Sequence, residues 1–328
     1  MCQRVKPPLT LSNSFTGCVQ FRSSTIQGTA AAMWSALLLV ALMFGAGGLL
    51  TRLGIFSDTA ADTINRFVVY VSLPALVLHA MPRLHLDSSL WLLIAVPWLT
   101  LLVGVLACQF AARAFGWSRP VLGALLLCVP VGNTSFLGLP LLNALLGPDA
   151  VQYGVVYDQA GSFLILSTYG LLVLARYAGS SPPTAAELAR RVFGFPPFIA
   201  LVLGLLPVSW PEALDAVLAR IGDTLVPLAM FAVGMRLRLR PPAEPSALGV
   251  GLAIKMVLFP LCALGLVRLV GASGLPAQVA VLEAAMPPML TAAALAQMAG
   301  LAPELCAALA GYGIVLAFVI LPLWAALI

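Results

Sequence analysis

Charged residues are scarce in this sequence: they make up 9% of its 328 residues, and lysine occurs only as Lys6 and Lys255. An average soluble domain is about 25% charged. Here hydrophobic residues reach 61% and the mean hydropathy is +1.04, which excludes a soluble globule. The net charge of +5 is spread over short segments between apolar runs, so it reports membrane topology and gives no reason to expect a nucleic-acid partner. The sequence therefore predicts a polytopic protein of the lipid bilayer.

Apolar runs near the length of about 20 residues that crosses a bilayer recur from residue 34 to the end of the chain. We expect an all-α protein with about ten membrane-spanning helices. The longest polar linker, residues 177–191, separates five spans in residues 33–176 from five in residues 192–328. The expected spans cover roughly residues 34–51, 63–81, 89–114, 120–146, 150–176, 192–208, 213–236, 246–270, 276–300 and 304–327.

Residues 1–32 form a polar leader that has no acidic residue and no apolar core long enough for a signal peptide. Two interpretations fit this segment. Its start codon was assigned too early and Met33 is the first residue, or the segment is a short disordered tail.

Arginines in the connecting segments predict the orientation of the chain. Ten arginines follow odd-numbered spans and three follow even-numbered spans. Because basic residues concentrate in cytoplasmic loops, we expect both termini outside and the linker 177–191 in the cytoplasm. The arginine-rich composition is typical of a GC-rich bacterial genome.

The stretch 125–142 lies inside an apolar span and yet is built to interrupt a helix. Pro130, Gly132 and Pro140 bracket three polar residues, Asn133 to Ser135. Proline removes a helical hydrogen bond, and unpaired backbone groups are costly in hydrocarbon. Such a break persists where it faces protein or lines a cavity that holds water or a ligand. The alternatives are a binding site and a simple proline kink in a packed helix.

Pro287 and Pro288 predict a second break, in the ninth span. The segment starting at Gly132 aligns with the segment starting at Pro287 at an offset of 155 residues, and Asp62 with Asp215 at an offset of 153. With five spans in each half, the second half enters the membrane from the opposite side, so the repeat would be inverted. Broken helices in the two halves of such transporters meet near the bilayer midplane at the substrate site.

The two breaks predict a site for an organic anion. The first amides of a half-helix are unpaired, and the positive end of its dipole favours a carboxylate. Asn133, Thr134 and Ser135 could add side-chain donors at the first break, and Thr291 could do so one turn after the second. Pro130, Gly132, Pro287 and Pro288 would shape the backbone of this site.

Four ionisable residues lie within the expected spans, where such residues are rare and often functional. They are Asp158, Asp223, Lys255 and Glu283. Glu283 could carry a coupled proton or help bind Na⁺, or it could be a neutral, hydrogen-bonded acid. Lys255 could pair with Glu283 or Asp223, or meet the substrate. A structural network is the favoured interpretation for Asp158. No residue spacing suggests a metal site or another cofactor.

Four motifs in this order resemble the auxin efflux carrier family, including its bacterial malate and malonate permease-like members. They are VPVGNTSFLGLPLL at 129–142, YDQAGSF at 157–163, GDTLVPLAMFAVGMRL at 222–237 and EAAMPP at 283–288. The resemblance covers nearly everything after Met33. It implies two inverted five-helix repeats with spans 4 and 9 broken and crossing, a fold shared with bile-acid sodium symporters.

The resemblance also assigns residues at the crossing. Asn133, Pro130 and the Pro287–Pro288 pair match the family's crossing residues, and Glu283 resembles a glutamate in the sodium site of bile-acid symporters. Relatives often carry asparagine shortly after the second break, where this chain has residues 289–292 without one. The short linker is unlike the regulatory loop of plant auxin carriers, so the resemblance implies a permease of the bacterial inner membrane. The implied function is secondary active transport of a small organic anion, such as a dicarboxylate or an auxin-like acid.

Two other functional classes remain as alternatives. Tyr157–Asp158 and Gly222–Asp223 resemble the paired motifs of intramembrane aspartyl proteases, but Arg220 stands where that pattern has glycine. A passive channel or a sensory module is the other alternative. The sequence leaves the oligomeric state open, with a homodimer among the possibilities.

Overall fold

The computed structural model describes residues 35–57, 59–84, 90–179, 183–206, 210–237, 239 and 241–328. Every regular element in these residues is helical, and the only extended pairing among them is one isolated bridge between Gly132 and Pro288. The leader 1–32, interpreted as a mis-assigned start or a disordered tail, lies outside the described residues. The prediction of an all-α chain is confirmed for the described part.

Among the described residues, seven helical segments are long and apolar enough to cross a membrane. They are Ser35–Arg52, Ala60–Arg83, Leu90–Phe115, Asp149–Ala178, Glu212–Met235, Pro245–Leu269 and Pro303–Leu327. Within them lie α2 (Ala60–Phe67), α3 (Leu73–Ala80), α4 (Leu90–Phe115), α7 (Asp149–Tyr157), α8 (Leu171–Ala178), α11 (Glu212–Gly222), α12 (Leu225–Met235), α13 (Pro245–Ala253), α14 (Phe259–Leu269) and α17 (Pro303–Leu327).

The remaining predicted spans are built from shorter helices. The fourth consists of α5 (Arg119–Cys128) and a second piece, Thr134–Leu146, that ends in α6 (Leu139–Leu146). The ninth consists of α15 (Leu275–Ala285) and α16 (Leu290–Met298). The predicted sixth span contains the short α10 (Pro196–Gly204). A count of ten spans therefore stays a prediction.

The linker between the two halves contains a helix that its polar composition did not predict. Helix α9 (Ala185–Phe193) begins at a capping box, in which Thr184 and Glu187 satisfy each other's backbone amides. The hydrogen bonds from Thr184 hold the pKa of the Glu187 carboxyl below its usual value. The linker is thus partly ordered, and it places Arg190 and Arg191 in the last turn of a helix.

Several membrane helices contain π-helical turns, which the sequence pattern did not predict. Three of the five carry polar candidate residues: Thr134–Gly138, Asp158–Phe163 and Ile254–Leu258. A π-helical turn inserts an extra residue in the helix, and it occurs frequently at functional sites. The other two are Val68–Ser72 and Leu166–Gly170.

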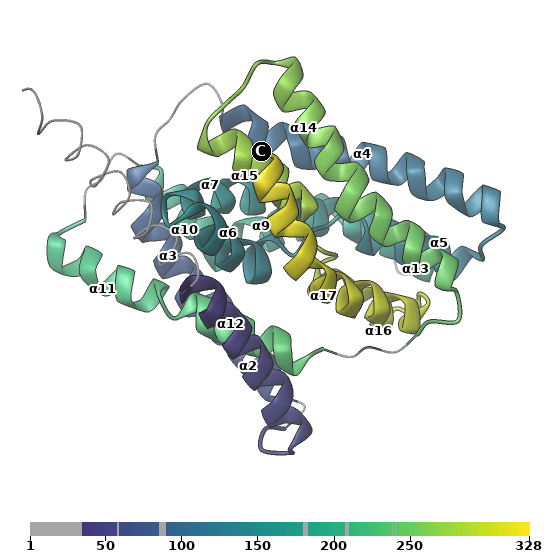
Figure 1. Cartoon of the computed structure of the whole chain (residues 1–328), viewed down its shortest axis with the longest axis horizontal. Helices are drawn as coiled ribbons and strands as arrows, with labels where there is room; N and C mark the ends of the chain where they lie inside the picture. Colours follow the sequence, from purple (N-terminus) through teal and green to yellow (C-terminus); the bar gives the residue numbers. More distant parts are fainter. Residues whose placement is uncertain are drawn as a thin grey trace, which may run out of the picture.

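The helices form two groups. In the first, which we call the panel, α3 packs against α10 and α11, and α2 packs against α12. Gly47 of helix Ser35–Arg52 lies against the backbone of Phe231, so this helix joins the panel through close contact with α12. The second group, the core bundle, contains α4 to α8 and α13 to α17, and most of the largest buried cluster belongs to it. Figure 1 shows α3, α11 and α12 on one side of the molecule and α4, α13 and α14 on the other.

Candidate functional site

The first break interrupts the fourth predicted span between Cys128 and Thr134. Helix α5 ends at Cys128, and Asn133 leaves the helical region with φ −80° and ψ 63°. Proline at 130 prevents continuation of the helical hydrogen bonds, and the chain resumes as a π-helical turn before α6. Both Pro130 and Gly132 are buried, so the interruption lies inside the protein.

The second break interrupts the ninth predicted span between Ala285 and Leu290. Met286 and Met289 have extended backbones, with ψ of 142° and 129°, on either side of two prolines. The residue before a proline is disfavoured in the helical region, so the dipeptide Pro287–Pro288 ends α15 at this point. All four residues are buried. Both breaks therefore lie where the sequence placed them.

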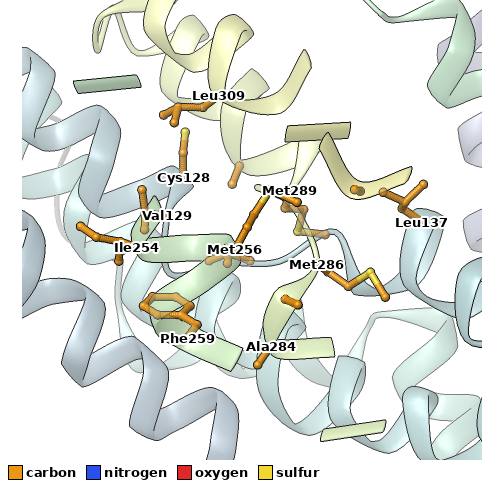
Figure 2. Close-up of a cluster of buried hydrophobic side chains, with 14 of the residues drawn as sticks. Cys128, Val129, Leu137, Ile254, Met256, Phe259, Ala284, Met286, Met289 and Leu309 are labelled. Carbon is orange, nitrogen blue, oxygen red and sulfur yellow. The ribbon is translucent and has the colours of Figure 1, made fainter. Parts of the chain in front are cut away.

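The two breaks are hydrogen-bonded to each other. The backbone N–H of Asn133 donates to the carbonyl oxygen of Pro287 at 2.8 Å, and the N–H of Met289 donates to that of Val131 at 3.0 Å. These bonds form an antiparallel bridge between Gly132 and Pro288. They satisfy backbone groups that the broken helices leave free, as a membrane interior requires. Figure 2 shows the side chains of Met256, Met286 and Met289 close together in the buried hydrophobic cluster, with Val129 and Phe259 nearby.

Asn133 lies at this pairing and has no hydrogen-bond partner for its side chain. The residue is 0% exposed, and neither its Nδ2 nor its Oδ1 is bonded. A buried amide without partners is destabilising by about 1–3 kcal/mol for each unmet group. Such a group can donate to and accept from a molecule that enters the site.

Thr134 and Ser135, the next two residues, are already engaged. Both hydroxyls donate to Oδ1 of Asp158, from Ser135 at 2.6 Å, and Gln159 Nε2 donates to Oδ2 at 2.7 Å. Asp158 is 1% exposed, so three donors surround a carboxylate inside the core bundle. The arrangement fixes the start of the π-helical turn to the neighbouring span. We expected these hydroxyls to serve a ligand directly, whereas here they hold Asp158.

Glu283 is a second buried carboxylate with different surroundings. It lies in the last turn of α15, is 0% exposed, and neither of its oxygens has a hydrogen-bond partner. A Cβ added to Gly138 would be 2.7 Å from Glu283 Oε2, and one added to Gly154 would be 3.2 Å from Oε1. Two glycines of neighbouring helices thus make the space for this side chain.

Lys255 lies on the other side of the first break. It is 2% exposed, and a Cβ added to Gly132 would be 3.1 Å from its Nζ. Of the partners that the sequence leaves open for Lys255, neither Glu283 nor Asp223 forms a salt bridge with it in this conformation. Its ammonium lies 4.9 Å from the centroid of the Phe259 ring.

Asp223 is separate from the other candidates. It is exposed in the turn between α11 and α12 and lines a cavity of about 560 Å³ with His79, Arg83 and Asn143. Asp158 lines a different cavity. The two aspartates that an intramembrane protease would need to share a proton are therefore not brought together.

The cavity at the breaks has a volume of about 410 Å³ and extends from the pairing to the linker. Ser135, Asp158 and Thr291 lie on its wall together with Met289, and Arg190 and Arg191 belong to its rim. We had interpreted these arginines only as topological charges in a loop. Nothing in the sequence pattern places α9 over the breaks, although the paired arginines after a Thr-x-x-Glu capping signal could have suggested an ordered segment.

A family model described as membrane transport protein matches residues 32–190 and 194–325. The chain belongs to this family, the auxin efflux carrier family. The family consists of membrane transporters and not of enzymes, so the protease alternative is wrong. A multi-pass membrane protein is the architecture that the long apolar helices and the family share.

Curated relatives of this family are similar over most of the chain. An uncharacterized transporter of Methanothermobacter thermautotrophicus is 30% identical over 306 residues, covering 90% of this chain and 97% of that protein. An uncharacterized transporter of Methanocaldococcus jannaschii is 25% identical over 254 residues, covering 71% and 79%. A protein of Rhizobium meliloti provisionally named a malonate transporter is 28% identical over 260 residues, covering 74% and 78%.

Proposed function

We propose that this protein is a secondary active transporter that carries a small organic anion by alternating access. The observation that carries the proposal is the pairing of two broken helices around Asn133, whose amide is fully buried and has no partner. A single proline kink needs no second broken helix and no unmet polar side chain. Paired breaks with polar groups are the substrate sites of transporters built from two repeats.

A carboxylate is the substrate group that this geometry suits best. The amides at the start of Thr134–Gly138 and of α16 stand at the positive ends of two half-helices. Arg190 and Arg191 at the cavity rim would attract an anion toward Ser135 and Thr291. The relative that is provisionally named a malonate transporter favours a dicarboxylate as the first substrate to test.

Alternating access would come from movement of the core bundle against the panel. Cavities on two sides support this mechanism: the larger one involves the start of helix Ser35–Arg52 and α6, and the smaller one involves the linker and α16. With termini outside and the linker cytoplasmic, the first faces outward and the second inward. We place the protein in a bacterial inner membrane with this orientation.

An inverted repeat of five spans and five spans would provide the symmetry of the mechanism. Two ion pairs support it: Asp62 binds Arg236, and Asp215 binds Arg83. Asp62 and Asp215 are 153 residues apart along the chain, and so are Arg83 and Arg236. Each pair joins a panel helix of one half to its counterpart in the other. Spans 4 and 9 would then cross at the pairing of the breaks.

Glu283 is the group that we assign to ion coupling. Its carboxylate is buried without a partner and lies four residues before the second break. A proton bound there would relieve the cost of the unmet oxygens. Asp158 is held by three donors, and Asp223 lines the outer cavity, so neither is as well placed.

The test is uptake of labelled malonate by proteoliposomes that contain the purified protein or its Asn133→Ala variant. We expect the variant to lose uptake and to stay folded, because it removes two unmet polar groups and no side-chain hydrogen bond. Asn65→Ala, in α2 and outside both cavities, is the matched control and should transport normally. Unchanged uptake by Asn133→Ala would reject the site. Currents far above carrier turnover would favour a channel.

A further inference from the structure

Lys255 stands out because a lysine inside a membrane protein is costly and this one forms no salt bridge with a described residue. It occupies the π-helical turn Ile254–Leu258 in the middle of the eighth predicted span. Lys6 lies in the leader, so Lys255 is the one lysine of the sequence within a predicted span. A charged side chain at such a position is rare and has a functional role by default. The question is what stabilises it.

Neither buried carboxylate forms a salt bridge with Lys255, although the charge of Glu283 acts on it at a longer distance. Both oxygens of Asp158 accept hydrogen bonds from other side chains, and the oxygens of Glu283 lie against Gly138 and Gly154. No described residue makes a salt bridge with Lys255. The ring of Phe259, 4.9 Å from Nζ, contributes a cation–π contact on one side. The remaining partner is the backbone of the first break.

The break offers the electronegative groups that a cation needs. Helix α5 ends at Cys128, so its last carbonyls and the negative end of its dipole point toward residues 129–132. The absence of a side chain at Gly132 leaves room for the ammonium: a Cβ there would lie 3.1 Å from Nζ and 3.5 Å from Cε. Interrupted helices of transporters use freed carbonyls and helix C-termini of this kind to coordinate Na⁺.

We propose that Lys255 is a built-in cation of the first break, and that its ammonium occupies the position at which a transporter of this architecture would otherwise bind Na⁺. Its three donors and single positive charge match that role. The side chain cannot dissociate, so the break keeps its shape through the whole cycle without a dissociable metal ion at this position. The proposed site lies at Gly132, whereas the carboxylate of Glu283 lies against Gly138 and Gly154.

The experiment measures the melting temperature of the purified wild type and of its Lys255→Ala and Lys255→Met variants. Each protein is melted in NaCl, LiCl, methylammonium chloride and choline chloride at equal ionic strength. For the wild type we expect the same melting temperature in all four salts. For the variants we expect a saturable rise of the melting temperature with a small cation and none with choline, because the vacated site then binds the cation. Arg268→Ala, which removes a positive charge from exposed α14, should show no cation effect.

Transport gives a second readout, and this readout rests on the proposed function. Wild-type uptake should be equal in Na⁺ and choline, whereas the variants in choline should be slower by about 5- to 150-fold, the usual range of coupling between sites. If the wild type moves no organic anion in any salt, the proposed function fails and the melting experiment still decides the role of Lys255.

Three results would overturn the proposal. The first is a saturable Na⁺ stabilisation of the wild type that Lys255→Ala and Lys255→Met leave unchanged. The second is a pair of folded variants that no small cation stabilises. The third applies if both variants unfold in choline: failure of Na⁺, Li⁺ and methylammonium to recover them during purification would show that Lys255 is needed for some other reason.

Discussion

The two breaks share a backbone arrangement and differ in their side chains. At the first, Asn133, Thr134 and Ser135 are polar, and two of them bind Asp158. At the second, the chain continues from two prolines into Met289 and Leu290, and a Cβ added to Gly313 would be 2.9 Å from Pro288. One break is surrounded by hydrogen-bonding groups and the other by apolar packing.

The charged residues of the second half strengthen this contrast. Lys255 lies against Gly132 and Glu283 against Gly138, so both are directed at the broken helix of the first half. The second break therefore contributes mainly backbone hydrogen bonds, whereas the polar and charged side chains lie at the first break. Substitutions at the first break should therefore affect uptake more strongly, and substitutions at the second break should affect mainly stability.

The largest effect is expected at Asp158. Asp158→Ala leaves two hydroxyls and the Gln159 amide buried without their acceptor, at about 1–3 kcal/mol for each unmet group. We expect a large fall in melting temperature together with loss of uptake. Asp158→Asn keeps an oxygen that can accept from Thr134 and Ser135, so it should recover most of the stability.

Equal destabilisation by the alanine and asparagine variants would contradict this account of the first break. It would mean that the negative charge, and not the hydrogen-bond acceptor, matters for folding. Thermal melts in detergent, followed by uptake assays on the surviving proteins, separate the two possibilities.

Sequence reasoning located both breaks because proline has only a few ways to fit into an apolar span. The residues that join the breaks were harder to find. The hydrogen bonds from Asn133 to Pro287 and from Met289 to Val131 link segments about 155 residues apart, which no local pattern encodes. The aligned offsets suggested which segments correspond, but correspondence in a repeat does not say that two segments touch.

The partners of the polar residues were the least predictable part. The π-helical turns at Thr134, Asp158 and Ile254 rotate the following residues relative to an ideal helix, so facing residues cannot be found from a 3.6-residue period. The pairing of Lys255 with Glu283 was a reasonable expectation from charge, yet each approaches a different glycine. The role of Arg190 and Arg191 at the cavity rim depends on the fold of the linker.

Adding a methyl group beside each break should have a smaller effect, and the two substitutions should differ in whether they reduce stability or uptake. Gly313→Ala would press a Cβ against the rigid rings of Pro287 and Pro288, and such overpacking is destabilising by about 1–3 kcal/mol. Gly138→Ala meets the end of the flexible Glu283 side chain, which can move with less strain. We expect Gly313→Ala to reduce the melting temperature more, and Gly138→Ala to reduce uptake more.

The comparison requires both measurements on both variants, with wild-type protein in the same lipid. If Gly138→Ala transports normally, the position of the Glu283 carboxylate is unimportant for the cycle. If Gly313→Ala melts like the wild type, the second break is less tightly packed than its distances indicate.

The smallest effects are expected at the two ion pairs of the panel. They lie away from the breaks and allow corresponding positions of the two halves to be compared. Asp215 accepts two bonds from Arg83, at 3.2 Å and 2.6 Å, and one contact from His79 at 2.9 Å, and its side chain is 24% exposed. Asp62 contacts Arg236 once and is 59% exposed. Exposed pairs contribute about 0.2–1 kcal/mol, and bidentate geometry places a pair toward the upper end.

Double-mutant cycles measure these couplings without the other effects of each substitution. The cycle of Asp215→Asn with Arg83→Gln should give the larger coupling, and the cycle of Asp62→Asn with Arg236→Gln should give a value near zero. A larger coupling at Asp62 would reverse the order that exposure and geometry predict. Because Asp62 and Arg236 lie outside the breaks and outside the inward and outward cavities, uptake by their single variants should stay close to wild type. Loss of uptake without loss of stability would instead mean that the panel pairs open and close during transport, and the two halves would then differ in their movement as well as in their chemistry.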